Sequence, residues 1–213
     1  MFCKVRPLGF FLALFLGSIS SDIDDYLPLT TGHTSTNYGE TGLFEMPTAR
    51  FQEAGNLKFG FSSFRPYEVT SISASPFSWM ESTFRYTEIK NQLYSPYAFY
   101  SGNQTLKDKG FDFKIRLFKE SRFLPAVAVG LRDLAGTGLF ASEYIVATKR
   151  IKNVDLTGGI GWGVMNRNGI SNPLGKITER FYDRGVNSTE GITSGGELNT
   201  SSFFRGEDAG LFE

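Results

Sequence analysis

Cysteine, net charge and long apolar runs are scarce in this 213-residue chain, and each absence excludes a class of protein. Cys3 is the only cysteine, so neither an internal disulfide nor a cysteine metal site can form. Basic and acidic residues number 22 each and the pI is near 6.6, so the basic excess of a nucleic-acid-binding surface is missing. No apolar run in the mature chain reaches about 20 residues, which excludes a helical membrane protein.

Signals for catalysis are equally sparse. His33 is the only histidine and stands in a polar segment, which is typical of a surface residue. The chain therefore lacks a Ser/His/Asp set in plausible order, an H-E-x-x-H motif and a histidine metal cluster. The glycine-rich run 158–163 is not followed by the helix that a phosphate-binding loop needs, and glycine there suits sheet curvature. We predict no enzymatic activity, no cofactor and no metal.

The first residues have the layout of a secretory signal peptide. Lys4 and Arg6 precede an apolar run, 8–17, that is too short to span a membrane, and small residues follow it. We predict that residues 1–21 are a cleaved signal peptide, which removes the single cysteine before it could carry a lipid. Residues 22–55 show no period through their polar first half, and we predict a periplasmic N-terminal lead.

The rest of the chain has a two-residue period. Apolar and charged side chains alternate from Phe111 to Leu117, which gives a strand one apolar face and one charged face. Similar patterns predict about eight strands, at 57–65, 69–75, 80–87, 111–117, 126–132, 140–150, 154–164 and 203–213. Several of these runs have roughly 9–11 residues, enough to cross a bilayer at a tilt, whereas strands of soluble sheets have about 5–6.

We therefore predict an all-β fold, an antiparallel up-and-down transmembrane β-barrel or part of one, over residues 56–213. If the strands run up and down, the two long connections near 89–109 and 165–201 fall on one side and all opposite turns are short. Outer-membrane barrels have that asymmetry, with long extracellular loops and short periplasmic turns. We expect the protein in a bacterial outer membrane, in contact with its lipid.

The cost of charge in lipid predicts which face points inward. A basic side chain facing lipid at mid-depth costs up to about 2–4 kcal/mol, so the apolar face must point outward and the charges must line the interior. These charges could meet a polar polymer, or they could only pair with one another and fill space. The candidate lumen-lining residues are Glu81, Arg85, Asp112, Lys114, Arg116 and Arg132.

Five ordered segments resemble the YjbH family of outer-membrane exopolysaccharide biosynthesis proteins. They are Gly42–Arg50, Pro76–Glu88, Lys109–Arg116, Leu124–Arg132 and Gly136–Tyr144, and the resemblance runs from about Gly39 to the end of the chain. It implies an outer-membrane barrel that works beside a polysaccharide export or capsule system, and it carries over no catalytic residue. Members of the family are much longer, so we expect an N-terminal portion whose barrel is incomplete at the C-terminus.

These observations predict a non-enzymatic barrel that assists the biosynthesis or secretion of an exopolysaccharide or capsule. The partners would be the polysaccharide, met by the interior charges and the loop 165–201, and other proteins of the export system. One alternative is a general porin or small-solute channel. Another is a secreted sugar-binding β-sandwich, in which the alternating faces would be core and solvent.

Overall fold

The structure is a computed structural model that describes residues 33–166, 169–184 and 202–213. The predicted signal peptide and most of the second half of the predicted loop 165–201 lie outside the described residues. Nearly all regular structure is β, apart from a single helical turn, α1 (Ala98–Ser101), and a short 3₁₀ helix, Glu179–Phe181. No described helix is long and apolar enough to cross a membrane.

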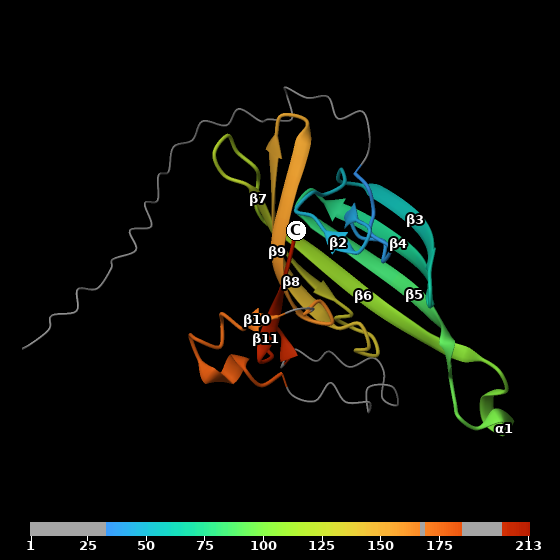
Figure 1. Ribbon diagram of the computed structural model, residues 1–213. Coiled ribbons are helices and arrows are strands. Elements are labelled where there is room, and N and C mark those ends of the chain that lie inside the picture. The colour runs from blue at the N-terminus through green and yellow to red at the C-terminus, as the bar shows by residue number, and fades with distance from the viewer. Residues whose placement is uncertain (1–32, 167–168, 185–201) are drawn as a thin grey trace, which may run out of the picture.

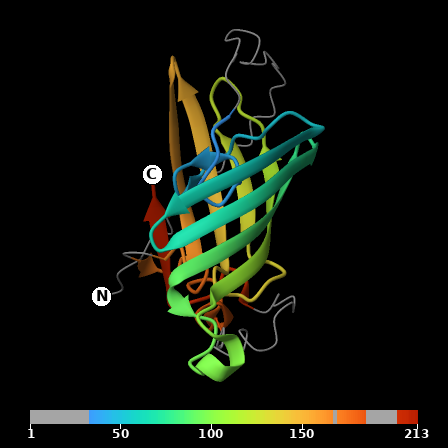
Figure 2. The ribbon, with the colours of Figure 1, turned by 90° about the vertical axis from the view of Figure 1, so that its right-hand side faces the viewer.

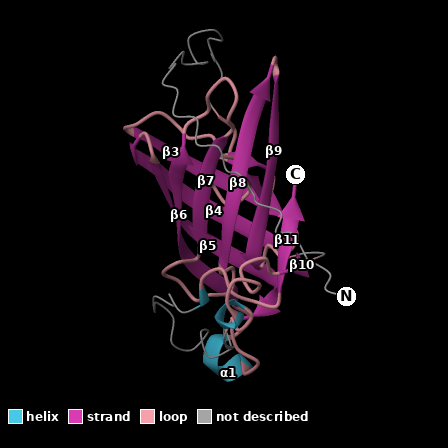
Figure 3. Cartoon of the chain, turned by 90° about the vertical axis from the view of Figure 1, so that its left-hand side faces the viewer, coloured by secondary structure: helices cyan, strands magenta, loops and turns pink. Residues whose placement is uncertain are grey.

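One antiparallel sheet of nine strands makes up most of the molecule (Figure 1). Its strands are β3 (Asn56–Phe64), β4 (Tyr67–Phe77), β5 (Met80–Leu93), β6 (Thr105–Phe118), β7 (Ala126–Arg132), β8 (Ser142–Ile151), β9 (Val154–Gly163), β10 (Ile170–Ser171) and β11 (Asp208–Phe212). From β3 to β9 each strand pairs with the next strand in the chain, and β11 pairs with the other side of β9. Figure 3 shows the strands side by side in the curled sheet.

This arrangement confirms the predicted all-β class, the antiparallel pairing and the up-and-down order. All eight predicted strands are present, although the last begins at Asp208 instead of 203 because residues 202–207 form turns and bends. The structure adds β10, which lies inside the predicted loop and pairs with β11. The outer strands are β3 and β10, and the described residues contain no pairing between them.

The two faces of the sheet are the reverse of those in a soluble protein. Phe59 and Phe61 on β3 are 72% and 70% exposed, and Phe111, Ile115 and Leu117 on β6 also face outward. The opposite face buries charged side chains beside polar and apolar ones, and buried charges are rare unless they are paired. The predicted orientation, with apolar side chains outward and charges inward, is therefore found in the sheet.

The inner face is covered by residues 33–51. This segment includes the short hairpin of β1 (Gly42–Leu43) and β2 (Met46–Pro47), which lies between the β3–β4 side and the β8–β9 side of the sheet in Figure 1. The Ala49 amide donates to Thr148 Oγ1 on β8 at 2.8 Å. Part of the predicted periplasmic lead thus packs on the sheet, while its place in the cell stays a prediction.

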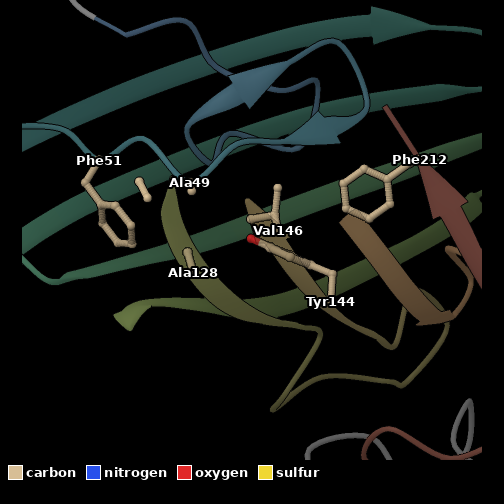
Figure 4. Packing of buried hydrophobic residues seen from close by; sticks show 7 residues of the cluster. Ala49, Phe51, Ala128, Tyr144, Val146 and Phe212 are labelled. Atoms are coloured by element: carbon tan, nitrogen blue, oxygen red, sulfur yellow. The ribbon is translucent and has the colours of Figure 1, made fainter. Parts of the chain in front are cut away.

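A small apolar cluster joins this segment to the far strands (Figure 4). Its buried members are Ala49, Phe51, Ala126, Ala128, Tyr144, Val146 and Phe212. They come from the N-terminal segment, β7, β8 and β11, so the cluster ties both ends of the described chain to the same part of the inner face.

Candidate functional site: the charged inner face

Arg85 on β5 lies at the centre of the first group of buried charges. Its guanidinium lies 3.2 Å from Asp112, 3.3 Å from Asp108 and 3.7 Å from Asp133, measured between the closest charged atoms. The alternation of β5 and β6 brings Arg85, Asp108 and Asp112 to one face, as predicted for Arg85 and Asp112. The Phe140 ring lies 4.7 Å from the guanidinium carbon and covers the cation from the other side.

Lys114 on β6 anchors the N-terminal segment. Its ammonium lies 3.2 Å from Glu81 and donates to the carbonyl oxygens of Thr41 at 2.9 Å and Arg50 at 3.0 Å. Glu81 in turn accepts a 2.5 Å hydrogen bond from the Thr41 amide. Glu81 and Lys114 therefore pair with each other, and both bind backbone groups of the covering segment. Each buried charge thus has a partner of opposite charge and a polar backbone partner.

Arg132 on β7 pairs with a residue that the sequence pattern did not single out. Its guanidinium donates to the Glu40 carboxylate through Nε at 2.7 Å and also through Nη2. The Tyr144 hydroxyl donates to the other carboxylate oxygen of Glu40 at 2.6 Å. Burial alone would raise the pKa of Glu40, but the Arg132 and Lys114 cations and the Tyr144 hydrogen bond hold that pKa below its usual range.

Arg116 differs from the other five candidates. It is only half-buried, and its guanidinium carbon lies 4.6 Å from the centre of the Phe51 ring, which Lys114 also approaches at 4.7 Å. A cation over an aromatic face gains electrostatic attraction from the ring. Arg116 therefore holds the N-terminal segment through Phe51.

Glu40, Asp108, Asp133 and Tyr144 are the residues of the site that sequence reasoning missed. Asp108 lies four residues before Asp112 on β6 and so faces the same side of the sheet, which means that the alternation could have predicted it. Glu40 carried no signal, because it lies in a non-periodic segment 92 residues from Arg132. The described residues hold no group of three or more His, Cys, Asp or Glu side chains that could bind a metal ion.

The described part of the predicted loop 165–201 is divided: Met165 packs against the apolar cluster of the inner face, β10 extends the sheet, and Asn172 and Arg184 contact the outward side of β8 and β9. Asn172 is buried, accepts a hydrogen bond from Trp162 Nε1 at 3.0 Å and donates to backbone carbonyls that include Gly206 at 2.9 Å. Arg184 pairs with Glu143 at 2.7 Å. Contact of this loop with a polymer stays a prediction.

Comparison with known proteins identifies the family. Residues 34–212 match the model of the YjbH family, which is described as "Exopolysaccharide biosynthesis protein YbjH". The chain belongs to the YjbH family. The match spans both the N-terminal segment and every strand of the sheet, so the covered inner face lies within the part that the family model describes.

A relative from Escherichia coli (strain K12), "Uncharacterized lipoprotein YjbH", is 39% identical over 200 residues. The alignment covers 93% of this chain but 28% of the relative, so the chain spans less than a third of the length of this family member. No solved structure matches the chain.

Proposed function

We propose that this chain is the N-terminal part of an outer-membrane β-barrel that assists the biosynthesis or secretion of an exopolysaccharide, without catalysing a reaction. The observation that carries the proposal is the inverted sheet, which exposes aromatic and aliphatic side chains and buries paired charges. In water that exposed surface would be a large apolar patch, whereas in a bilayer it meets hydrocarbon. The choice of an exopolysaccharide as the polymer follows from the description of the family.

The N-terminal segment, residues 33–51, covers the charged inner face of the sheet. Arg85, Lys114, Arg132 and their acidic partners are buried beneath or beside residues 33–51. A polymer could reach them only after this segment moves, so we propose that the segment closes the interior in the state described. The same coverage disfavours a general porin, since a porin needs an open interior.

The third function, a secreted β-sandwich, fits the burial less well. A sandwich buries its apolar faces and exposes its charges, and this sheet has the opposite arrangement. The name of the Escherichia coli relative also favours the cell envelope, because a lipoprotein is held at a membrane.

Fractionation and deletion test the proposal together. We expect the protein in the outer-membrane fraction, soluble only with detergent and shifted in gel mobility on heating. Deletion of the gene should lower secreted polysaccharide, and the wild-type gene should restore it. Recovery of the protein from the periplasm without detergent, or an unchanged polysaccharide yield in the deletion strain, would contradict the proposal.

A further inference from the structure

The connection between β5 and β6 presents a group of uncovered aromatic side chains. Phe99 and Tyr100 in α1 are 90% and 73% exposed, and Tyr94 and Tyr97 beside them are more than half exposed. No residue of α1 is buried. Figure 2 shows α1 beyond the ends of the strands, at the tip of the longest hairpin of the sheet. We call residues 94–100 the aromatic tip.

The aromatic tip has a defined shape. The Tyr94 and Tyr100 rings stack with centres 6.5 Å apart and planes within 11°, and the Tyr97 and Phe99 rings lie 5.6 Å apart. The Tyr94 amide donates to the Gln104 carbonyl at 2.9 Å, which closes the base of the loop. The rings therefore stabilise one another and leave their outer faces open to solvent.

A band of charge separates the aromatic tip from the apolar surface. Moving along the outward face from the Phe84–Phe111 pair toward the tip, the next row holds Tyr86 opposite Lys109. The positions beyond it carry charged side chains, which are Glu68, Glu88, Lys90 and Lys107. Lys90 pairs with Glu68 and with Glu88, each at 2.9 Å, and both partners are partly exposed.

The charged band argues against a lipid contact for the tip. Aromatic girdles of membrane barrels lie directly at the edge of the apolar band, at the level of the headgroups. Here Tyr86 lies at that level, the charged residues follow it, and the tip lies farther out. The β5 strand has 14 residues and so is about 45 Å long, more than a tilted crossing needs. The aromatic tip therefore stands in water above the membrane surface.

The chemistry of the tip fits a sugar. From Asn91 to Leu106 the chain has no charged residue, while it carries tyrosine hydroxyls, serines, asparagines and glutamines. The flat faces of pyranose rings carry C–H groups that stack on aromatic rings, and their hydroxyls exchange hydrogen bonds with amides and hydroxyls. We infer that the aromatic tip binds pyranose units in an uncharged stretch of the extracellular polysaccharide; this inference rests on the proposed function.

Binding by the detergent-solubilised full chain tests the inference. The probe is a set of oligosaccharide fragments prepared from the polysaccharide that the same cells secrete, followed by saturation-transfer NMR and tyrosine fluorescence. We expect the variant Tyr97→Ser/Phe99→Ser/Tyr100→Ser to bind at least about tenfold more weakly, because three stacking faces are lost. The variant Tyr97→Phe/Tyr100→Phe keeps the faces and should retain most of the binding.

Phe123→Ser supplies the matched control, since Phe123 is also exposed but lies in the β6–β7 connection at the opposite end of the sheet. It should bind the fragments as the wild type does. The inference would be overturned if the triple serine variant bound the fragments as tightly as the wild type does. It would also be overturned if the variant lost association with phospholipid vesicles and kept its binding to sugar. Failure of the proposed function would differ, because the wild-type protein would then leave the membrane fraction or its deletion would leave polysaccharide secretion unchanged.

Discussion

Charged residues of the inner face are stabilised by specific side-chain partners. Arg132 and Glu40 are both buried, and each would be costly to leave alone in that environment. Tyr144 completes the set by donating to the second carboxylate oxygen of Glu40. The three side chains come from β7, β8 and the N-terminal segment, so the pair fixes that segment against the sheet.

We expect Arg132→Met to lower the free energy of unfolding by about 3–5 kcal/mol, because it leaves the Glu40 carboxylate buried and unpaired. The double variant Glu40→Gln/Arg132→Met should recover much of that loss. Urea unfolding in detergent micelles measures both. Lys90→Met is the matched control, since water screens its exposed ion pairs and their loss should change stability far less. Equal losses for Arg132→Met and Lys90→Met would contradict this view of the inner face.

Asp133 should make stability depend on pH. Burial raises the pKa of its carboxyl to about 6, although the Arg85 cation opposes the rise. The folded state therefore holds this proton more tightly than the unfolded state, and the contribution of Asp133 to stability falls as the pH rises from about 4 to above 6. The wild type should lose up to about 3 kcal/mol of its free energy of unfolding across that range through Asp133, and we expect Asp133→Asn to lack this loss. Urea titrations at pH 4 to 7 give the free energy of unfolding of the wild type and of Asp133→Asn as a function of pH. The same pH dependence in both proteins would refute the role of Asp133.

At the scale of the element, a glycine on β7 makes room for a ring on β8. A Cβ atom at Gly130 would lie 2.1 Å from Cζ of Tyr144, the ring that reaches Glu40. The clash would displace a hydroxyl whose hydrogen bond joins the strand to the N-terminal segment.

Gly130→Ala should therefore destabilise the protein by about 1–3 kcal/mol, as overpacking does in a filled interior. Gly158→Ala on β9 is the control, because a Cβ there would meet only the Phe212 carbonyl oxygen, at 3.8 Å, and should change stability by no more than about 0.5 kcal/mol. Thermal unfolding of the two variants, each against wild type, makes the comparison, and similar shifts would contradict the role of Gly130.

The elements also show what the sequence could predict. The alternation at Phe111–Leu117 predicts that Asp112 and Lys114 lie on the inner face of the sheet, and both are buried there. This prediction is possible because alternation is a local property of the sequence. The packing of residues 33–51 on the inner face was missed, since a segment with irregular backbone leaves no period to detect. Its contacts with Thr148 and Arg132 join residues about 90 to 100 apart, and pairing over that distance is set by the tertiary fold.

At the scale of the whole molecule, the covered inner face predicts that movement of the N-terminal segment is needed for function. Ala49→Cys and Thr148→Cys would place two thiols where the backbone amide and side chain now meet, and Cys3→Ser removes the remaining cysteine. A short, reducible thiol crosslinker should then lower polysaccharide secretion to the level of the deletion strain, and a reductant should restore it. Ala49→Cys alone, treated alike, controls for the reagent, and undiminished secretion by the tethered protein would show that the segment stays in place.

The free side of β3 has a consequence for assembly. Among the described residues β3 pairs with β4 alone, so its other row of backbone amides and carbonyls has no strand beside it. Hydrocarbon supplies no hydrogen bonds, and a bare row of peptide groups there costs several kcal/mol for each group. Inserted by itself, this polypeptide should recruit a strand donor along Asn56–Phe64, either another molecule of its own kind or additional sequence such as its longer relative possesses.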